Sequence, residues 1–413
     1  NLLPMINEWI SPSIINKFAW PTWVNALKNA HEPKNINHIT FDSPNRLRLA
    51  YDEMLAHQLT LAIARENYRK SKGIKNIGNK SLSKKVMEFI PFELTNAQKR
   101  VIEEIRNDMS EPFRMNRLLQ GDVGSGKTLI AFLCMVTAIE AGGQAVIMAP
   151  TEILTKQHED TLKPLAEKAG IVLESLSGRD KGKERKSKIE AIATGKIQII
   201  VGTHAVFQES IKYNDLRLAI IDEQHRFGVR QRMDLGNKGD AVDILIMTAT
   251  PIPRSLALTN YGDMELSEVD EKPIGRKPIN TVMVSSSRIL EVIDRLKVAI
   301  ETGNQIYWVC PLVEESEFLE LTSAEDRANN LSKVLGKNNI GLVHGKMSGE
   351  EKDRVMSDFV DNKIKILVAT TVIEVGVDVP NATIIVIEPS ERFGLSQLHQ
   401  LRGRVGRGAD AST

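Results

Sequence analysis

The segment Gly121-Asp-Val-Gly-Ser-Gly126-Lys127-Thr128 decides the fold. It matches G-x-x-x-x-G-K-[ST], the pattern of the phosphate-binding loop, and has a β-rich apolar run before it and a helical pattern after it. Glycines let backbone N–H groups converge on phosphate oxygens, and the helix N-terminus adds a favourable dipole. The spacing therefore predicts a site for ATP and Mg²⁺. The expected phosphate contacts are Gly121, Gly124, Gly126 and Lys127, and the Thr128 hydroxyl is expected to bind Mg²⁺.

Short apolar runs and longer helical patterns alternate around this loop. Such alternation is typical of an open, mostly parallel sheet with helices on both faces. A polar stretch at 270–278, with two prolines and a glycine, predicts a linker to a second series of the same kind. In the first series we expect strands at 116–120, 144–149, 197–201, 216–221 and 242–247, with helices at 129–140, 153–168 and 184–193. In the second we expect strands at 279–284, 305–309, 341–344, 364–369 and 383–387, with helices at 288–301, 324–335 and 349–361.

The predicted fold class is therefore α/β. Two tandem parallel-sheet domains follow a short helical segment, in which 47–68 has apolar residues at helical spacing. We expect the helical segment to span 1–90, the first parallel-sheet domain 91–272 and the second 273–413.

The composition is that of a folded protein, with 42% hydrophobic and 26% charged residues among 413. The net charge of +1 excludes a histone-like basic arm but not a nucleic-acid partner, because local patches set the field at a binding groove. Cys134 and Cys310 are too isolated for a disulfide framework or a zinc site, so we expect two buried thiols. The longest apolar run, 129–139, is too short to span a bilayer, so no membrane partner is expected.

An acidic pair, Asp222 and Glu223, ends the apolar run that begins at Leu218. After a phosphate-binding loop, such a pair predicts that Asp222 holds Mg²⁺ directly or through a water and that Glu223 orients the attacking water. Two exposed acids in a loop are the plainer alternative.

Three further stretches carry weaker signals. In 92–98, Phe92 is placed to stack on adenine and Gln98 to bond its edge, and Thr95 with Gln98 also forms a capping-box pattern. In 248–254, hydroxyl side chains follow a strand, although the stretch alone reads as a turn with two prolines. In 400–408, arginines alternate with glycines, which suits either a solvated or nucleic-acid-binding stretch or arginine fingers that reach a γ-phosphate.

Together these segments resemble the superfamily 2 helicases, whose core motifs occur in order between about residues 91 and 408. The resemblance implies that the two parallel-sheet domains are tandem RecA-like motor domains. Within that superfamily the RecG family of branched-DNA helicases is the most similar. The resemblance rests on five segments: Arg117-Leu-Leu-Gln-Gly-Asp-Val-Gly-Ser-Gly-Lys-Thr128, Asp222-Glu-Gln-His-Arg-Phe-Gly-Val-Arg-Gln-Arg232, Trp308-Val-Cys-Pro-Leu-Val-Glu-Glu-Ser-Glu317, Val372-Ile-Glu-Val-Gly-Val-Asp-Val-Pro-Asn381 and Gln397-Leu-His-Gln-Leu-Arg-Gly-Arg-Val-Gly-Arg-Gly408. Transcription-repair coupling translocases share part of this pattern but usually carry Glu at the position of Gln224 and lack the segment Val313-Glu-Glu-Ser-Glu317.

The resemblance implies a role for each matching position. It implies that MgATP is bound and hydrolysed by Lys127, Thr128, Asp222 and Glu223. It also implies that Arg404 and Arg407 contact the γ-phosphate. The nucleotide contacts also include Phe92, Gln98, Asp378 and Gln400. Contacts to the duplex backbone fall to Pro150, Thr151, Glu152, Thr203, His204, Thr370 and Thr371, and coupling of hydrolysis to motion falls to Gln224, His225, Thr248 and Thr250.

The implied function is an ATP-dependent double-stranded DNA translocase or helicase that remodels replication forks and Holliday junctions in recombination and repair. The resemblance also implies a monomer in the bacterial cytoplasm, with single-stranded DNA-binding protein as a further partner. Full-length members have a wedge domain before the motor and further segments after the arginine motif, so we expect a truncated motor. A fragment that binds ATP or DNA without coupled unwinding, and an RNA helicase, remain alternatives.

Two basic segments leave their roles open. Residues 65–85 hold eight Lys and Arg against one acid, and residues 179–188 hold six against two. Each is either a solvated helix face or a surface that contacts phosphates.

Overall fold

The fold is known from a computed structural model. It describes residues 6–38, 40–69, 72–178, 180–222, 241–250, 264–271, 279–311, 317–370, 379, 381–406 and 412–413. The chain divides into two compact units, one formed mainly by residues up to 70 and the other by residues 71–252 and 265–413.

The first unit is helical. It contains α1 (Pro12–Phe18), α2 (Trp23–His31), the short 3₁₀ turn η2 (Ile36–His38) and the long helix α3 (Pro44–Arg69), which confirms the helix expected at 47–68. Arg48 is fully buried on α3, where it forms ion pairs with Glu8 at 2.6 Å and with Asp52. These partners offset the cost of removing the guanidinium from water.

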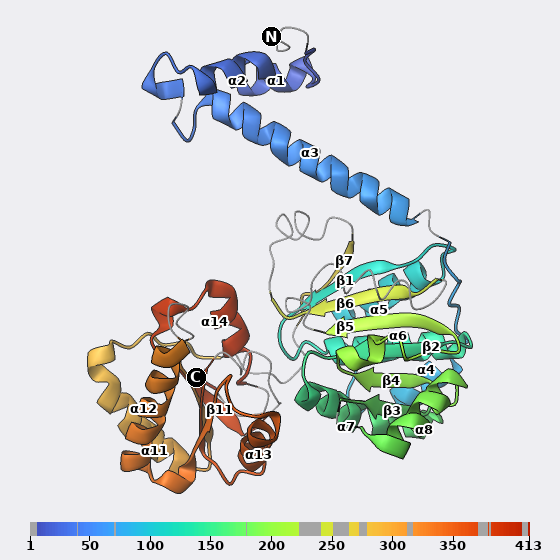
Figure 1. Cartoon of the computed structure of the whole chain (residues 1–413), viewed down its shortest axis with the longest axis vertical. Coiled ribbons are helices and arrows are strands. Elements are labelled where there is room, and N and C mark those ends of the chain that lie inside the picture. Colours follow the sequence, from blue (N-terminus) through green and yellow to red (C-terminus); the bar gives the residue numbers. More distant parts are fainter. Residues whose placement is uncertain are drawn as a thin grey trace. The chain divides into compact units, whose positions relative to one another are not determined.

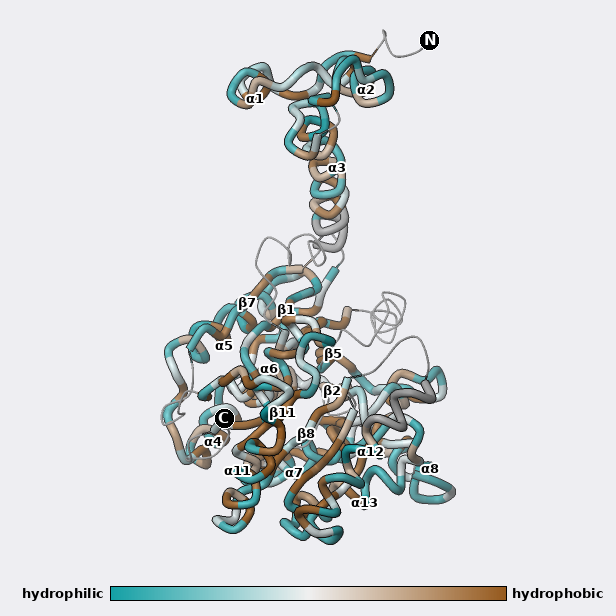
Figure 2. Tube along the Cα trace, turned by 90° about the vertical axis from the view of Figure 1, so that its left-hand side faces the viewer, coloured by the Kyte–Doolittle hydropathy of each residue, from teal (hydrophilic) through white to brown (hydrophobic). Residues whose placement is uncertain are grey.

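A parallel seven-stranded sheet forms the first half of the second unit (Figure 1), with strand order β3-β4-β2-β5-β6-β1-β7. Its central strands are buried almost throughout, as continuous apolar runs covered on both faces require. The apolar composition of the strands contrasts with the mostly hydrophilic α8 (Figure 2). The strands are β1 (Asn116–Gly121), β2 (Gln144–Met148), β3 (Leu173–Leu176), β4 (Ile199–Gly202), β5 (Leu216–Asp222), β6 (Asp243–Thr248) and β7 (Glu265–Val269).

Helices α4 to α7 pack on one face of this sheet in a single apolar cluster that includes Val86, Ile105, Phe132 and Leu162. α5 begins with the expected capping box, in which Thr95 and Gln98 each bond the other's backbone N–H. The helices of this half are α4 (Ser81–Glu88), α5 (Asn96–Met109), α6 (Lys127–Glu140), α7 (Glu152–Ala169) and α8 (Gly182–Ala193), with the 3₁₀ turn η3 (His204–Phe207).

A second parallel sheet has the strand order β11-β8-β10-β9. One face packs on α11 and α12 through Trp308, and the other packs on α13 through Tyr307 and Phe359 (Figure 1). The strands are β8 (Gln305–Val309), β9 (Ile340–Val343), β10 (Ile366–Ala369) and β11 (Ala382–Ile387). The helices are α11 (Ile289–Glu301), α12 (Glu317–Leu335), α13 (Gly349–Val360) and α14 (Leu395–Arg402), with 3₁₀ turns η5 (Ser286–Arg288), η6 (Lys337–Asn339) and η8 (Ser390–Arg392). Two α/β halves with parallel sheets confirm the expected fold class.

One expected strand is wrong. Residues 279–284 form no strand, and Met283 is 96% exposed. The Asn280 N–H donates to the Ser412 carbonyl, but a single bond does not form a β-ladder. Residues with high β-propensity form a strand only where a neighbouring strand pairs with them. Strands β3 and β7, which flank the first sheet, were not expected, because β3 has only four residues and β7 is part-polar.

A connector between residues 72 and 80 runs beside the first sheet. Asn76 bonds Met109 through its backbone, and its side-chain amide donates to Asp243 Oδ2 at 2.8 Å. Asp243 is 1% exposed at the start of β6, and its Oδ1 accepts from the Met115 N–H at 2.8 Å. Burial raises the pKa of Asp243 to about 7, although both hydrogen bonds act against that rise. This carboxyl group is therefore titratable near neutral pH.

Both cysteines are buried thiols, as expected. Burial raises the pKa of Cys134 to about 12 and that of Cys310 to about 11, so both are protonated and unreactive at neutral pH. In the described part of the chain, no helix combines the length and the apolar character needed to cross a membrane.

Candidate nucleotide and nucleic-acid site

The phosphate-binding loop joins β1 to α6, as the sequence predicts. β1 lies between β6 and β7, and all three strands are parallel. The loop therefore leaves the carboxyl edge of the sheet, where open α/β sheets bind ligands. α6 begins at Lys127, so the loop amides and the helix dipole lie together at this edge.

Lys127 folds back into its own loop. Its Nζ donates to the carbonyl oxygens of Gly121 at 2.7 Å and Asp122 at 2.9 Å, and the residue is 9% exposed. The ammonium group is therefore held inside the loop, where phosphate oxygens can replace the carbonyl oxygens as its partners.

Two features of the loop bear on whether it can bind a phosphate group. Gly126 has φ of 90°, and a Cβ there would lie 2.3 Å from Gln98 Nε2, so any other residue would be strained. The Ser125 hydroxyl is buried and has no hydrogen-bond partner among the described residues. Gly124 is exposed and Thr128 half-buried. The loop thus combines a glycine-dependent backbone with an unused buried hydroxyl.

Gln98 lies against the loop rather than in an open pocket. It is 3% exposed, its Nε2 donates to the Ser125 carbonyl at 2.8 Å, and its Oε1 accepts from the Thr95 N–H at 3.0 Å. The other expected adenine contact, Phe92, is 57% exposed. The structure therefore brings Gln98 to the phosphate-binding loop, while Phe92 lies on the surface.

Asp222 is the last residue of β5, and one of its carboxylate oxygens is hydrogen-bonded within the protein. His158 of α7 lies with its Nε2 2.9 Å from Asp222 Oδ2, and the two residues are 6% and 9% exposed. Thr128 and Asp222 supply the hydroxyl and carboxylate oxygens that Mg²⁺ prefers. His158 was not predicted, because a single histidine on a helix carries no local signal.

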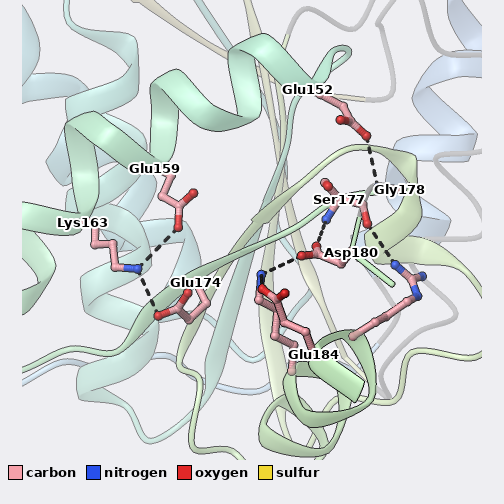
Figure 3. A network of polar contacts seen from close by, with 10 residues as sticks. Glu152, Glu159, Lys163, Glu174, Ser177, Gly178, Asp180 and Glu184 are labelled. Carbon is pink, nitrogen blue, oxygen red and sulfur yellow. Dashed lines mark hydrogen bonds and ion pairs between the residues drawn. The ribbon is translucent and has the colours of Figure 1, made fainter. Parts of the chain in front are cut away.

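The expected DNA-contact segment at the start of α7 is partly engaged within the protein. Thr151 caps the helix, accepting from the Leu154 N–H at 3.3 Å. Glu152 Oε1 accepts from the Gly178 N–H at 3.2 Å, which links α7 to the turn after β3 (Figure 3). Pro150, Thr151 and Glu152 are all half-buried.

The basic segment at 179–188 is in part an internal network (Figure 3). Lys188 pairs with Asp180 at 2.8 Å and Glu184 at 3.5 Å, and Arg185 donates to the Ser177 carbonyl at 3.0 Å. Burial is the largest single influence on Asp180 and Lys188 and opposes both charges. Their mutual hydrogen bond, the Ser177 N–H at Asp180 and the attraction of neighbouring opposite charges together outweigh it, which lowers the pKa of Asp180 and raises that of Lys188. Lys183 and Lys186 remain exposed on α8, and Lys181, the residue before the helix, is exposed as well.

The remaining expected DNA contacts lie at the ends of two strands. Thr203 follows β4 and is 5% exposed, whereas the next residue, His204, is exposed. Thr370 follows β10 and is 2% exposed, and its hydroxyl has no hydrogen-bond partner among the described residues.

Helix α14, which leads into the arginine segment (residues 400–408), bonds two loops of the first half: the phosphate-binding loop and the loop after β6. Gln400 of α14 is 6% exposed and donates from Nε2 to the Thr250 hydroxyl at 2.6 Å. Thr250 in turn donates its N–H to Thr248 Oγ1 at 3.1 Å. His399 Nε2 lies 3.1 Å from Oδ1 of Asp122 in the phosphate-binding loop. The sequence motifs did not indicate His399 or Asp122 as partners.

Arg404, just beyond α14, is 6% exposed. Six of the residues expected in the site lie outside the described residues. They are Glu223, Gln224, His225, Thr371, Asp378 and Arg407.

Comparison with known proteins identifies two helicase domains in the chain. Residues 95–259 match the DEAD/DEAH box helicase family and residues 288–409 match the helicase conserved C-terminal domain. ATP-dependent DNA helicase RecG of Bacillus subtilis is 48% identical over 394 residues, which are 95% of this chain and 57% of that protein. RecG of Thermotoga maritima is 47% identical over 93% of this chain and 49% of its own length. The chain thus spans about half the length of these relatives.

Solved structures give the same result. A structure of RecG bound to a three-way DNA junction has a TM-score of 0.80 and 42% identity, over 98% of this chain and 54% of that one. Yeast Dbp5 bound to RNA and ADP BeF3 has a TM-score of 0.60 at 16% identity, over 81% of this chain and 86% of that one, which shows a shared fold alone. By sequence and by structure, the chain contains both helicase domains and is similar to RecG over nearly its whole length.

Proposed function

We propose that the chain is the ATP-hydrolysing motor of a DNA translocase that remodels branched double-stranded DNA, such as forks and Holliday junctions. The phosphate-binding loop carries this proposal, because Lys127 is held inside a loop that depends on Gly126 and contains an unused buried hydroxyl. The identity to RecG proteins favours DNA over RNA. The proposal includes a monomer in the bacterial cytoplasm with single-stranded DNA-binding protein as a partner.

In the proposed hydrolysis, Lys127 exchanges the carbonyls of Gly121 and Asp122 for phosphate oxygens. Thr128 and Asp222 would hold Mg²⁺, and the bound ion would neutralise charge on the phosphates. Glu223 orients the attacking water, and Arg404 and Arg407 stabilise charge on the γ-phosphate. Asp378 and Gln400 line the same site, and Phe92 stacks on the base.

Contacts to the DNA backbone come from Pro150, Thr151, Thr203, His204, Thr370 and Thr371 in this proposal. Backbone contacts position a protein without reading sequence, which suits a motor that acts on any DNA. A carboxylate repels phosphate, so Glu152 contributes through the Gly178 N–H that it holds. The exposed lysines of α8, near this turn, supply further charge.

Coupling of hydrolysis to motion is assigned to Gln224, His225, Thr248 and Thr250. The bond from Gln400 to Thr250 supports this assignment, because it joins the arginine segment to the residues after β6. Loss of the bond in one nucleotide state would let the two segments separate.

A competition experiment tests the proposal. ATPase activity of the chain is measured with forked DNA, linear duplex DNA and RNA of equal length. We expect forked DNA to give the largest stimulation. Preference for RNA would reject the DNA assignment, and turnover indifferent to all three would indicate a nucleotide-binding fragment without coupling.

A further inference from the structure

His158 joins helix α7 to Asp222 at the end of β5. It is 6% exposed on α7, and its Nε2 lies 2.9 Å from Asp222 Oδ2. A neutral or charged imidazole donates this N–H to the carboxylate, which accepts. One of the two carboxylate oxygens is therefore fixed by α7, and the other is left for Mg²⁺ or its water.

The same helix carries the segment assigned to the DNA backbone. α7 begins at Glu152, and His158 follows six residues later, about 9 Å along a helix that rises 1.5 Å per residue. Thr151 caps the helix and Glu152 fixes its first turn to Gly178. A rigid element thus joins the expected DNA contacts to the expected magnesium carboxylate.

We propose that His158 is a positioning residue that orients Asp222 for Mg²⁺ and relays contacts at the start of α7 to the nucleotide site. This inference rests on the proposed function. Carboxylate ligands of metals are commonly oriented by hydrogen bonds, and loss of such a bond typically lowers metal affinity or activity 10- to 100-fold. Because α7 is one body, a shift of its first turn on DNA moves the donor that holds Asp222.

A packing role is the competing explanation, and two amides separate it from the proposed one. In His158→Gln the amide nitrogen lies near the place of Nε2, so it can still donate to Asp222. In His158→Asn the amide nitrogen lies near the place of Nδ1 and falls short. Both variants are polar and smaller than histidine. His57→Asn, on an exposed position of α3, is the matched control.

Binding of a fluorescent ADP analogue is measured over a range of Mg²⁺ concentrations and in EDTA, without turnover. We expect His158→Asn to raise the Mg²⁺ concentration at half-saturation about 10- to 100-fold, and to leave binding in EDTA unchanged. His158→Gln should stay within about threefold of wild type, and His57→Asn should match it. Thermal unfolding monitors the fold of each variant.

The relay is measured by the affinity for duplex DNA with and without Mg²⁺ and a non-hydrolysable ATP analogue. The ratio of these affinities should move toward one in His158→Asn and be kept in His158→Gln. Equal Mg²⁺ dependence in wild type and His158→Asn, or equal losses in both amides, would overturn the proposal while leaving the proposed function in place. A wild-type chain without Mg²⁺-dependent nucleotide binding would reject both.

Discussion

The amide of Gln98 donates to the carbonyl of Ser125 at 2.8 Å and so joins the first turn of α5 to the phosphate-binding loop. Its oxygen accepts from the Thr95 N–H at 3.0 Å within the capping box. With 3% of the residue exposed, both ends of the amide are committed. Gln98 therefore shapes the loop in addition to any contact with adenine.

Gln98→Glu separates the capping bond to Thr95 from the bond to the phosphate-binding loop. The carboxylate keeps the acceptor of the capping box but loses the donor to Ser125. One neutral hydrogen bond is worth about 1 kcal/mol, and a buried unpaired acceptor about 1–3 kcal/mol. We expect ATP affinity to fall about 5- to 100-fold, measured by titration calorimetry.

Thr95→Ala is the control for this prediction. It removes the cap of α5, so stability should fall by about 1 kcal/mol in urea unfolding. ATP affinity should change little, because Gln98 still reaches Ser125. If Thr95→Ala and Gln98→Glu weaken ATP equally, the loop-shaping role is wrong.

Gln400 and Thr250 should act as a pair. Gln400→Ala and Thr250→Ala each break the 2.6 Å bond, so each should lower DNA-stimulated ATPase about fivefold, the equivalent of about 1 kcal/mol. The double variant should lose little more than either single one. Basal ATPase without DNA is measured alongside. Losses that simply multiply would show that the bond does not couple the two segments.

The raised pKa of the buried Asp243 carboxyl should make the stability of the fold depend on pH. Its pKa rises from 3.8 to about 7 on folding, so between these values the folded chain holds a proton that the unfolded chain releases. Stability from this group is therefore greatest below pH 4 and declines as pH rises toward 7.

Asp243→Asn removes this dependence. Asn76 now donates from Nδ2 to Asp243 Oδ2, so its amide turns over in the variant and its Oδ1, which has no hydrogen-bond partner among the described residues, accepts from the new amide. Between pH 5 and 8.5, wild type should lose about 3 kcal/mol of unfolding free energy relative to the variant. Urea unfolding at both pH values measures this difference, and a constant difference would show that Asp243 does not titrate as inferred.

Local patterns predicted the parts of the fold that local physics determines. The apolar runs of β2, β5 and β6, the long α3 and the capping box of α5 all follow from spacing and composition. Residues 279–284 have the same β-rich composition yet form no strand, because pairing depends on chain far away in sequence. The short β3 carried too few residues for a signal.

In the candidate site, too, contiguous motifs could be read from the sequence, whereas contacts between distant residues could not. Gly126 and Lys127 could be assigned to one loop from the sequence because the phosphate-binding motif is contiguous. His158 and Asp222 are 64 residues apart, and His399 and Asp122 are 277 apart, so only the tertiary fold brings them together. The side chains that adjust the site are therefore less visible in sequence than those that form it.

The central claim is that Lys127 lies in the catalytic centre of an ATPase driven by DNA. ATP turnover by wild type and Lys127→Ala, with and without forked DNA, tests it most directly. Wild type should be stimulated by the fork, and Lys127→Ala should lose at least about 100-fold in turnover while it still binds DNA. DNA-stimulated hydrolysis that survives in Lys127→Ala would contradict the assignment of the site.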